Sequence, residues 1–182
     1  GSLHLRAGDP RLARESLAVA LAALPPTDDD HRRVEILMDL GAAHAMSDEF
    51  AAAVAAFSQA AALADESGDR DGFIAGQLAR ARAQLELGDV AAAAAVLEEV
   101  ARAMDTPGTN RSARQQLQLG ELYHRLDKAA GSTGHTAEAV RLLTTAAERA
   151  REEGDIRSES FALGYLGAIA ERFGIGPTLA FN

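Results

Sequence analysis

The sequence predicts an all-α solenoid of antiparallel helix pairs, and three observations support that prediction. The 182-residue chain is 47% hydrophobic but only 4% aromatic, with no Trp. Alanine supplies roughly a fifth of the residues, a usage that favours helix. Glycine positions and helical hydrophobic patterns both recur about every 40 residues. A core made of alanine and leucine requires closely packed helices.

Two sets of sequence marks define the repeat. The dipeptide Gly-Asp occurs at 8–9, 68–69, 88–89 and 154–155. The middles of successive apolar stretches are marked by Gly41, Ala81, Gly120 and Gly167. These marks are spaced by 40, 39 and 47 residues, which places a short insertion in the third interval.

A small–large–small triplet repeats in the second helix of each unit, with spacing i, i+4, i+7. The triplets are Ala13, Leu17 and Ala20; Ala53, Phe57 and Ala60; Ala93, Leu97 and Val100; and Ala139, Leu143 and Ala146. This spacing lies on one face of a helix, where small residues let helices approach and the large residue fills the space opposite. The alternative, an alanine-rich bundle without repeats, does not require a fixed 40-residue recurrence.

Eight helices follow from these patterns and their end signals. We expect them near 10–24, 31–46, 48–66, 70–87, 89–104, 110–129, 136–153 and 156–173, after a half-unit stub that ends near residue 7. The aspartate after each glycine can cap the next helix, and the glycine can end the preceding one in the left-handed conformation. The acidic runs at 28–30 and 47–49 favour helix starts, whereas 106–110 is a loop by composition.

Leu119-Gly120-x-x-Tyr123, followed by Ala139, Leu143 and Ala146, resembles the tetratricopeptide repeat (TPR). The spacing near 40 is similar to the long variety found in kinesin light chains, bacterial regulators and CHAT-associated arms. The resemblance implies a right-handed superhelical solenoid whose first helices line a concave groove. We expect one such domain over 1–182, with units at about 3–29 (partial), 30–68, 69–108, 109–154 and 155–182 (partial). Because both outer units are partial, we expect a longer parent protein.

Composition excludes several classes of partner. The net charge of −9 argues against nucleic-acid phosphate and anionic lipid, so we expect neither nucleic acid nor membrane. No apolar run approaches the roughly 20 residues of a membrane span. Cysteine is absent. A single Lys, at 128, among many Arg suggests a GC-rich bacterial source, and we expect a cytoplasmic protein.

The sequence lacks the residue types or spacings that are typical of catalytic, metal and cofactor sites. There is no Gly-x-Ser-x-Gly nucleophile elbow, and 131–134 is glycine-rich but lacks the lysine of a phosphate loop. Glu121-x-x-His124 has the spacing of a di-iron ligand pair, but a second pair is missing. We therefore predict no enzyme activity, no cofactor and no metal.

The resemblance places the candidate site on the first helix of each unit. Counted from the glycine marks, the predicted groove residues are Glu35, Met38, Asp39, Ala42, Met46, Leu78, Arg82, Leu85, Glu86, Arg114, Leu117, Gln118, Glu121, His124, Arg125, Phe161, Tyr165, Ala168 and Arg172. Apolar positions alternate with charged ones, which suits a peptide or helix that has both apolar and charged side chains. Arg82 and Arg125 could meet acidic groups of a ligand, unless Glu86 and Glu121 neutralise them within the protein. The apolar members could instead be core residues.

The predicted function is protein–protein interaction, with a peptide or partner helix bound in the groove. The alternative is a ligand- or peptide-sensing arm of a bacterial transcription regulator or CHAT-type protease. The segment 128–135 should extend the predicted helix 110–129 and end in a protruding loop, which offers a second contact surface. Uncapped solenoid ends also predict self-association.

Overall fold

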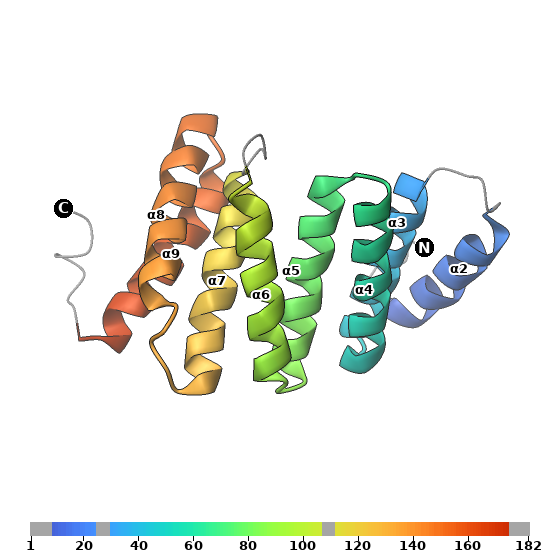
Figure 1. The fold of residues 1–182 in the computed structure, drawn as a ribbon, viewed down its shortest axis with the longest axis horizontal. Coiled ribbons are helices and arrows are strands. Elements are labelled where there is room, and N and C mark those ends of the chain that lie inside the picture. The colour runs from blue at the N-terminus through green and yellow to red at the C-terminus, as the bar shows by residue number, and fades with distance from the viewer. Residues whose placement is uncertain (1–8, 25–29, 107–111, 175–182) are drawn as a thin grey trace. The chain divides into compact units, whose positions relative to one another are not determined.

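The computed structural model describes residues 9–24, 30–106 and 112–174, and these residues form helices joined by short turns (Figure 1). The helices are α2 (Pro10–Ala23), α3 (Asp30–Ala45), α4 (Phe50–Glu66), α5 (Arg70–Glu86), α6 (Val90–Met104), α7 (Ala113–Ala130), α8 (Thr136–Glu153) and α9 (Ile156–Arg172). The chain divides into two compact units, residues 1–100 and 101–182, which we call unit 1 and unit 2. The all-α prediction is confirmed.

The Gly-Asp signals act at the helix ends as predicted. Asp9, Asp69, Asp89 and Asp155 each accept a hydrogen bond from a backbone N–H three residues ahead, at 2.9–3.2 Å. Gly68, Gly88 and Gly154 have φ between 72° and 78°, the left-handed conformation that closes the preceding helix. Gly8 and residues 107–111, where a loop was predicted, lie outside the described residues.

Two predicted helix starts are too early by two or more residues. α4 begins at Phe50 and not at 48, because Asp48 adopts a positive φ of 58° in the tight turn before it. α7 begins at Ala113, where the Ser112 hydroxyl and the Gln115 side chain cap each other's backbone N–H groups. Local side-chain capping therefore fixes the start of α7.

Unit 1 packs its triplet residues between neighbouring helices. α4 packs on both α3 and α5, and α2 packs on α3. Ala53 and Ala60 are fully buried and Phe57 is 6% exposed. A Cβ added to Gly41 would lie 2.5 Å from Cε1 of Phe57, so the glycine of α3 provides the space for this ring. The repeated glycine and the large residue of the repeated triplet therefore meet in one packing contact, Gly41 against Phe57.

Unit 2 repeats this contact with leucine. α8 packs on both α7 and α9, and Ala139, Leu143 and Ala146 are all fully buried. A Cβ added to Gly120 would lie 2.8 Å from Cγ of Leu143. The equivalent Gly167 of α9 has no described atom within 4 Å of such a Cβ.

The insertion lies between α7 and α8. α7 continues to Ala130, as predicted, but residues 131–135 are held against the helix instead of projecting freely. The reason is Asp127, whose fully buried carboxylate accepts hydrogen bonds from Ser132 Oγ (3.0 Å), the His135 backbone N–H (3.0 Å) and Thr136 Oγ1 (2.8 Å). The His135 ring also stacks on Tyr123, with ring centroids 4.9 Å apart. The prediction of a protruding loop is wrong for this reason.

Candidate functional site

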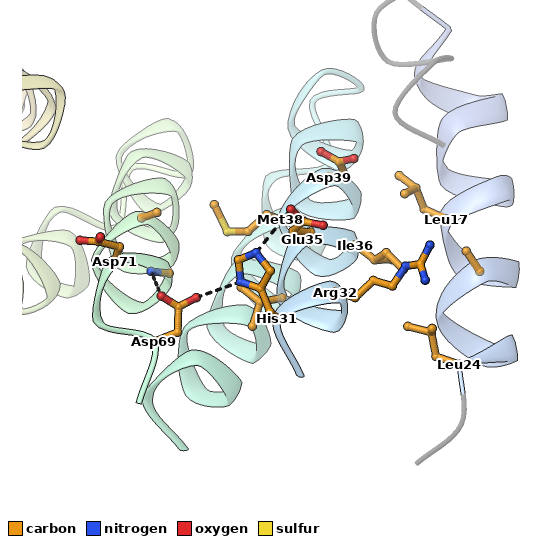
Figure 2. Close-up of a pocket in the computed structure, with 14 residues that line it drawn as sticks. Leu17, Leu24, His31, Arg32, Glu35, Ile36, Met38, Asp39, Asp69 and Asp71 are labelled. Atoms are coloured by element: carbon orange, nitrogen blue, oxygen red, sulfur yellow. Dashed lines mark hydrogen bonds and ion pairs between the residues drawn. The ribbon is translucent and has the colours of Figure 1, made fainter. Parts of the chain in front are cut away.

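Unit 1 contains an open cavity of about 950 Å³ between α2, α3 and the start of α5 (Figure 2). Its two sides differ in character. Leu17 and Ala20 of α2, Leu24 just after that helix and Ile36 of α3 form an apolar side, although Leu17 is only 3% exposed. The other side is polar and carries His31, Glu35, Asp39, Asp69 and Asp71, whereas the Arg32 side chain extends toward α2 (Figure 2). We call this cavity the acidic groove.

His31 connects the two helices that carry the acidic residues. Its Nε2 lies 3.6 Å from Glu35 Oε1, one helical turn along α3, and its Nδ1 lies 3.5 Å from Asp69 Oδ2 (Figure 2). Asp69 is in turn fixed because it caps α5 through the Gly72 N–H at 2.9 Å. Asp69 therefore both caps α5 and lines the groove.

The charge of the groove is predominantly negative. Four carboxylates line it, against the guanidinium of Arg32 and the imidazole of His31. The side chains of Glu35 and His31 are 66% and 65% exposed, so both are accessible to a ligand. An exposed acidic wall opposite an apolar wall matches a ligand that has one apolar face and one basic face.

A second polar cluster ties α2 to the turn before α4. Glu49 forms an ion pair with Arg14 and lies with its Oε2 2.6 Å from His44 Nδ1. Hydrogen bonds from Arg14 and then His44 lower the pKa of the Glu49 carboxyl. Because Glu49 partners both Arg14 and His44, we assign this cluster to structure.

Unit 2 has a different face, formed by α7 and α9. The rings of His124 and Tyr165 lie 6.5 Å apart, and Arg172 donates to the Ser132 carbonyl at 2.9 Å. Burial lowers the pKa of His124, and the positive charges of Arg172 and Lys128 lower it further. This imidazole therefore favours its neutral form near pH 7.

The predicted groove residues separate by exposure. Glu35, Met46, Arg82, Glu86, Arg114, Phe161, Ala168 and Arg172 are exposed, and Met38, Asp39, Ala42, Leu85, Gln118, Glu121, His124, Arg125 and Tyr165 are half-buried. Leu78 and Leu117 are only 3% and 9% exposed and belong to the core, so their place in the groove prediction is corrected. Arg125 Nη1 lies 3.7 Å from Glu121 Oε1, the internal pairing that was the rival to ligand binding.

The structure brings Glu35, Met38 and Asp39 together in the acidic groove, and it adds residues that the sequence analysis omitted. The omitted residues are Leu17, Ala20, Leu24, His31, Arg32, Val34, Ile36, Asp69, Asp71, Gly72 and Ala75. The prediction considered only first helices, whereas α2 is a second helix with one accessible side. The partial first unit was the signal that could have indicated this.

Over residues 9–24, 30–106 and 112–174, no three His, Asp or Glu side chains are grouped so that they could hold a metal ion. No helix in those same ranges combines the length and apolar character that crossing a bilayer requires.

Comparisons with known proteins identify the fold. No protein-family model and no curated protein matches the chain. Two solved structures of a candidate kinesin light chain from Podosopora anserina, described as nearly identical TPR-like repeats, do match. One of the two, a single-substitution variant, has a TM-score of 0.70, and the other has a TM-score of 0.68. Each is 21% identical, and the match covers 98% of this chain and 85% of that one. The predicted TPR-like solenoid fold is confirmed.

Proposed function

We propose that this chain is a protein-interaction module whose first helices bind a segment of a partner protein. One observation carries the proposal: the acidic groove is open and about 950 Å³ in volume, with an apolar and a charged side. TPR-like repeat folds generally mediate interactions between proteins, and the likeness to the kinesin light chain structures supports that role. We also propose that the chain has no catalytic activity.

The form of the groove suits a peptide or helix better than a small metabolite. A site for a small molecule encloses most of the ligand's surface, and a few polar groups in it point toward the ligand. Here the polar groups are spread along α3 and the start of α5, with apolar side chains facing them from α2. A peptide or helix contacts such a surface along its length. The finer prediction that Arg82 and Arg125 engage an acidic ligand stays a prediction.

Affinity capture from the source organism tests this proposal with a matched pair of variants. Ala75→Trp places a large ring in the acidic groove, whereas Ala55→Trp places the same ring on an exposed position of α4. We expect the captured partner to be lost with Ala75→Trp and kept with Ala55→Trp. Circular dichroism must show equal helicity for both variants. Retention of the same partner by Ala75→Trp would contradict binding in this groove.

A further inference from the structure

Unit 2 contains a buried polar atom to which none of the described residues donates a hydrogen bond. Gln116 of α7 is only 3% exposed, and its side-chain oxygen Oε1 is among the atoms that other groups cover. A buried amide oxygen without a donor is costly, so such groups in folded proteins are nearly always paired with protein or with ordered water. Gln116 therefore requires a donor that the described side chains do not supply.

The equivalent glutamine of unit 1 has a donor from its own helix. Gln77 of α5 lies 39 residues before Gln116, which is the spacing of the repeat at this point. Gln77 is also buried, but its Oε1 accepts a hydrogen bond from Arg80 Nη1 at 3.3 Å. The residue equivalent to Arg80 is Leu119, whose side chain carries no donor. The repeat thus identifies the interaction that Gln116 cannot make with its own helix.

The amide nitrogens of the two glutamines differ in the same way. Nε2 of Gln77 donates to Glu99 Oε2 of α6 at 2.8 Å. The repeated triplets of α6 and α8 are 46 residues apart, so the residue equivalent to Glu99 is Thr145. The Thr145 hydroxyl donates to the Arg141 carbonyl of its own helix at 3.0 Å. Neither side chain that holds Gln77 therefore has an equivalent at Gln116.

A small cavity lies beside the Gln116 side chain. Its volume is about 10 Å³, and it lies between the last turn of α6, α7 and α8. One water molecule needs about 10–15 Å³, so the cavity has room for one water and for no larger ligand. Asp105, Glu138 and Arg141 add polar groups to its lining. Arg141 Nε donates to Glu138 Oε2 at 2.8 Å, which fixes this pair beside the cavity.

We propose that this cavity binds one ordered water molecule, which donates a hydrogen bond to Gln116 Oε1. The water takes the place that the Arg80 guanidinium has beside Gln77 in unit 1. Its other hydrogen bonds go to the Glu138–Arg141 pair, since an internal water typically has about three polar partners. The water thereby adds a polar link between α7 and α8 to their apolar packing. This inference does not depend on the proposed interaction with a partner protein.

NMR can detect this water in the wild-type chain. We would record water-selected NOE spectra of methyl-labelled protein, because methyl protons do not exchange with water. We expect a water cross-peak at the methyl groups of Leu119 and Leu142, which line the cavity. Ile74, which is fully buried in unit 1, is the negative control. Spectra without a water cross-peak at either leucine would overturn the inference.

Two matched variants test whether the water depends on Gln116. Gln116→Leu removes the acceptor with little change in side-chain size, and the water cross-peaks should disappear. Gln77→Leu makes the same change in unit 1, where the acceptor already has a protein donor, and the cross-peaks should remain. If they persist in Gln116→Leu, exchanging protons of Arg141 explain them and the inference is wrong.

A crystal structure of the wild-type chain gives a result that does not require either variant to fold. Electron density for one water within hydrogen-bond distance of Gln116 Oε1 would support the inference. A protein group that donates to this oxygen in place of water would overturn it. Well-defined side-chain density around the cavity, with no density for a water inside it, would also overturn it.

Discussion

The fully buried carboxylate of Asp127 should be the strongest polar determinant of stability in unit 2. It accepts three hydrogen bonds at 2.8–3.0 Å, from Ser132, His135 and Thr136, and its Oδ1 lies 3.0 Å from the His135 imidazole Nδ1. Hydrogen bonds to a charged group each contribute about 1.5–3 kcal/mol. The three donor residues are half-buried, so their groups partly regain water when the carboxylate is removed. We therefore expect Asp127→Ala to cost about 3–4 kcal/mol, less than the sum of these bonds.

Tyrosine fluorescence gives a probe confined to the affected unit. The chain has two Tyr residues, at 123 and 165, both in unit 2, and no Trp. Tyr123 also stacks on the His135 ring that the carboxylate holds. Urea unfolding followed by tyrosine emission should show the full loss of stability for Asp127→Ala. A control substitution, Glu152→Ala on an exposed position of α8, should leave the unfolding midpoint nearly unchanged.

The pH dependence of stability tests independently whether the charged form of Asp127 stabilises the fold. Burial alone would raise the pKa of Asp127, but hydrogen bonds from Thr136, His135 and Ser132 outweigh it and lower this pKa. The stabilisation is therefore complete above the unfolded-state pKa of about 3.9 and disappears as the pH falls through the lower folded-state value. The stability difference between wild type and Asp127→Ala should narrow in acid. If Asp127→Ala lowers the free energy of unfolding by less than about 1 kcal/mol at pH 7, the carboxylate does not hold residues 131–135 as described.

Three other predictions follow from the packing and electrostatics. Phe57→Ala should lower the free energy of unfolding by about 3–5 kcal/mol, measured by urea titration, and near-zero loss would mean that the ring is not buried. Gly120→Ala should destabilise by about 1–3 kcal/mol, because its Cβ would lie 2.8 Å from a leucine side chain of α8. In contrast, Gly167→Ala should be neutral or stabilise by up to about 1 kcal/mol, and equal thermal shifts for the two would contradict the packing. In an NMR titration, the pKa of His124 should rise in Arg172→Ala, and an unchanged value would rule out the charge effect.

The helices and their contacts could be predicted because the repeat encodes them locally. Spacing alone identified Gly41 and Gly120 as equivalent, and the structure shows why: each faces the large residue of the following helix. The capping aspartates act within three residues of their own position, so sequence order fixes their partners. Information of this kind requires no knowledge of how distant helices pack.

The groove and the insertion could not be predicted in the same way. Periodicity shows which face of a helix is apolar, but not which neighbour covers it, so Leu78 was assigned to the groove although it lies in the core. Leu17 was recognised as a core residue, but its place beside the cavity depends on how α2, α3 and α5 pack together. Asp127 lies in an ordinary polar stretch, and its role depends on donors five to nine residues away.

Photo-crosslinking tests most directly whether the first-helix face of unit 1 binds a protein partner. A photoreactive amino acid would replace Glu35 in the acidic groove or Gln59 on the exposed surface of α4. After irradiation in extract of the source organism, mass spectrometry would identify the crosslinked peptides. We predict a crosslinked partner segment from position 35 and none from position 59. The same partner crosslinked from position 59, with none from position 35, would contradict the proposed groove.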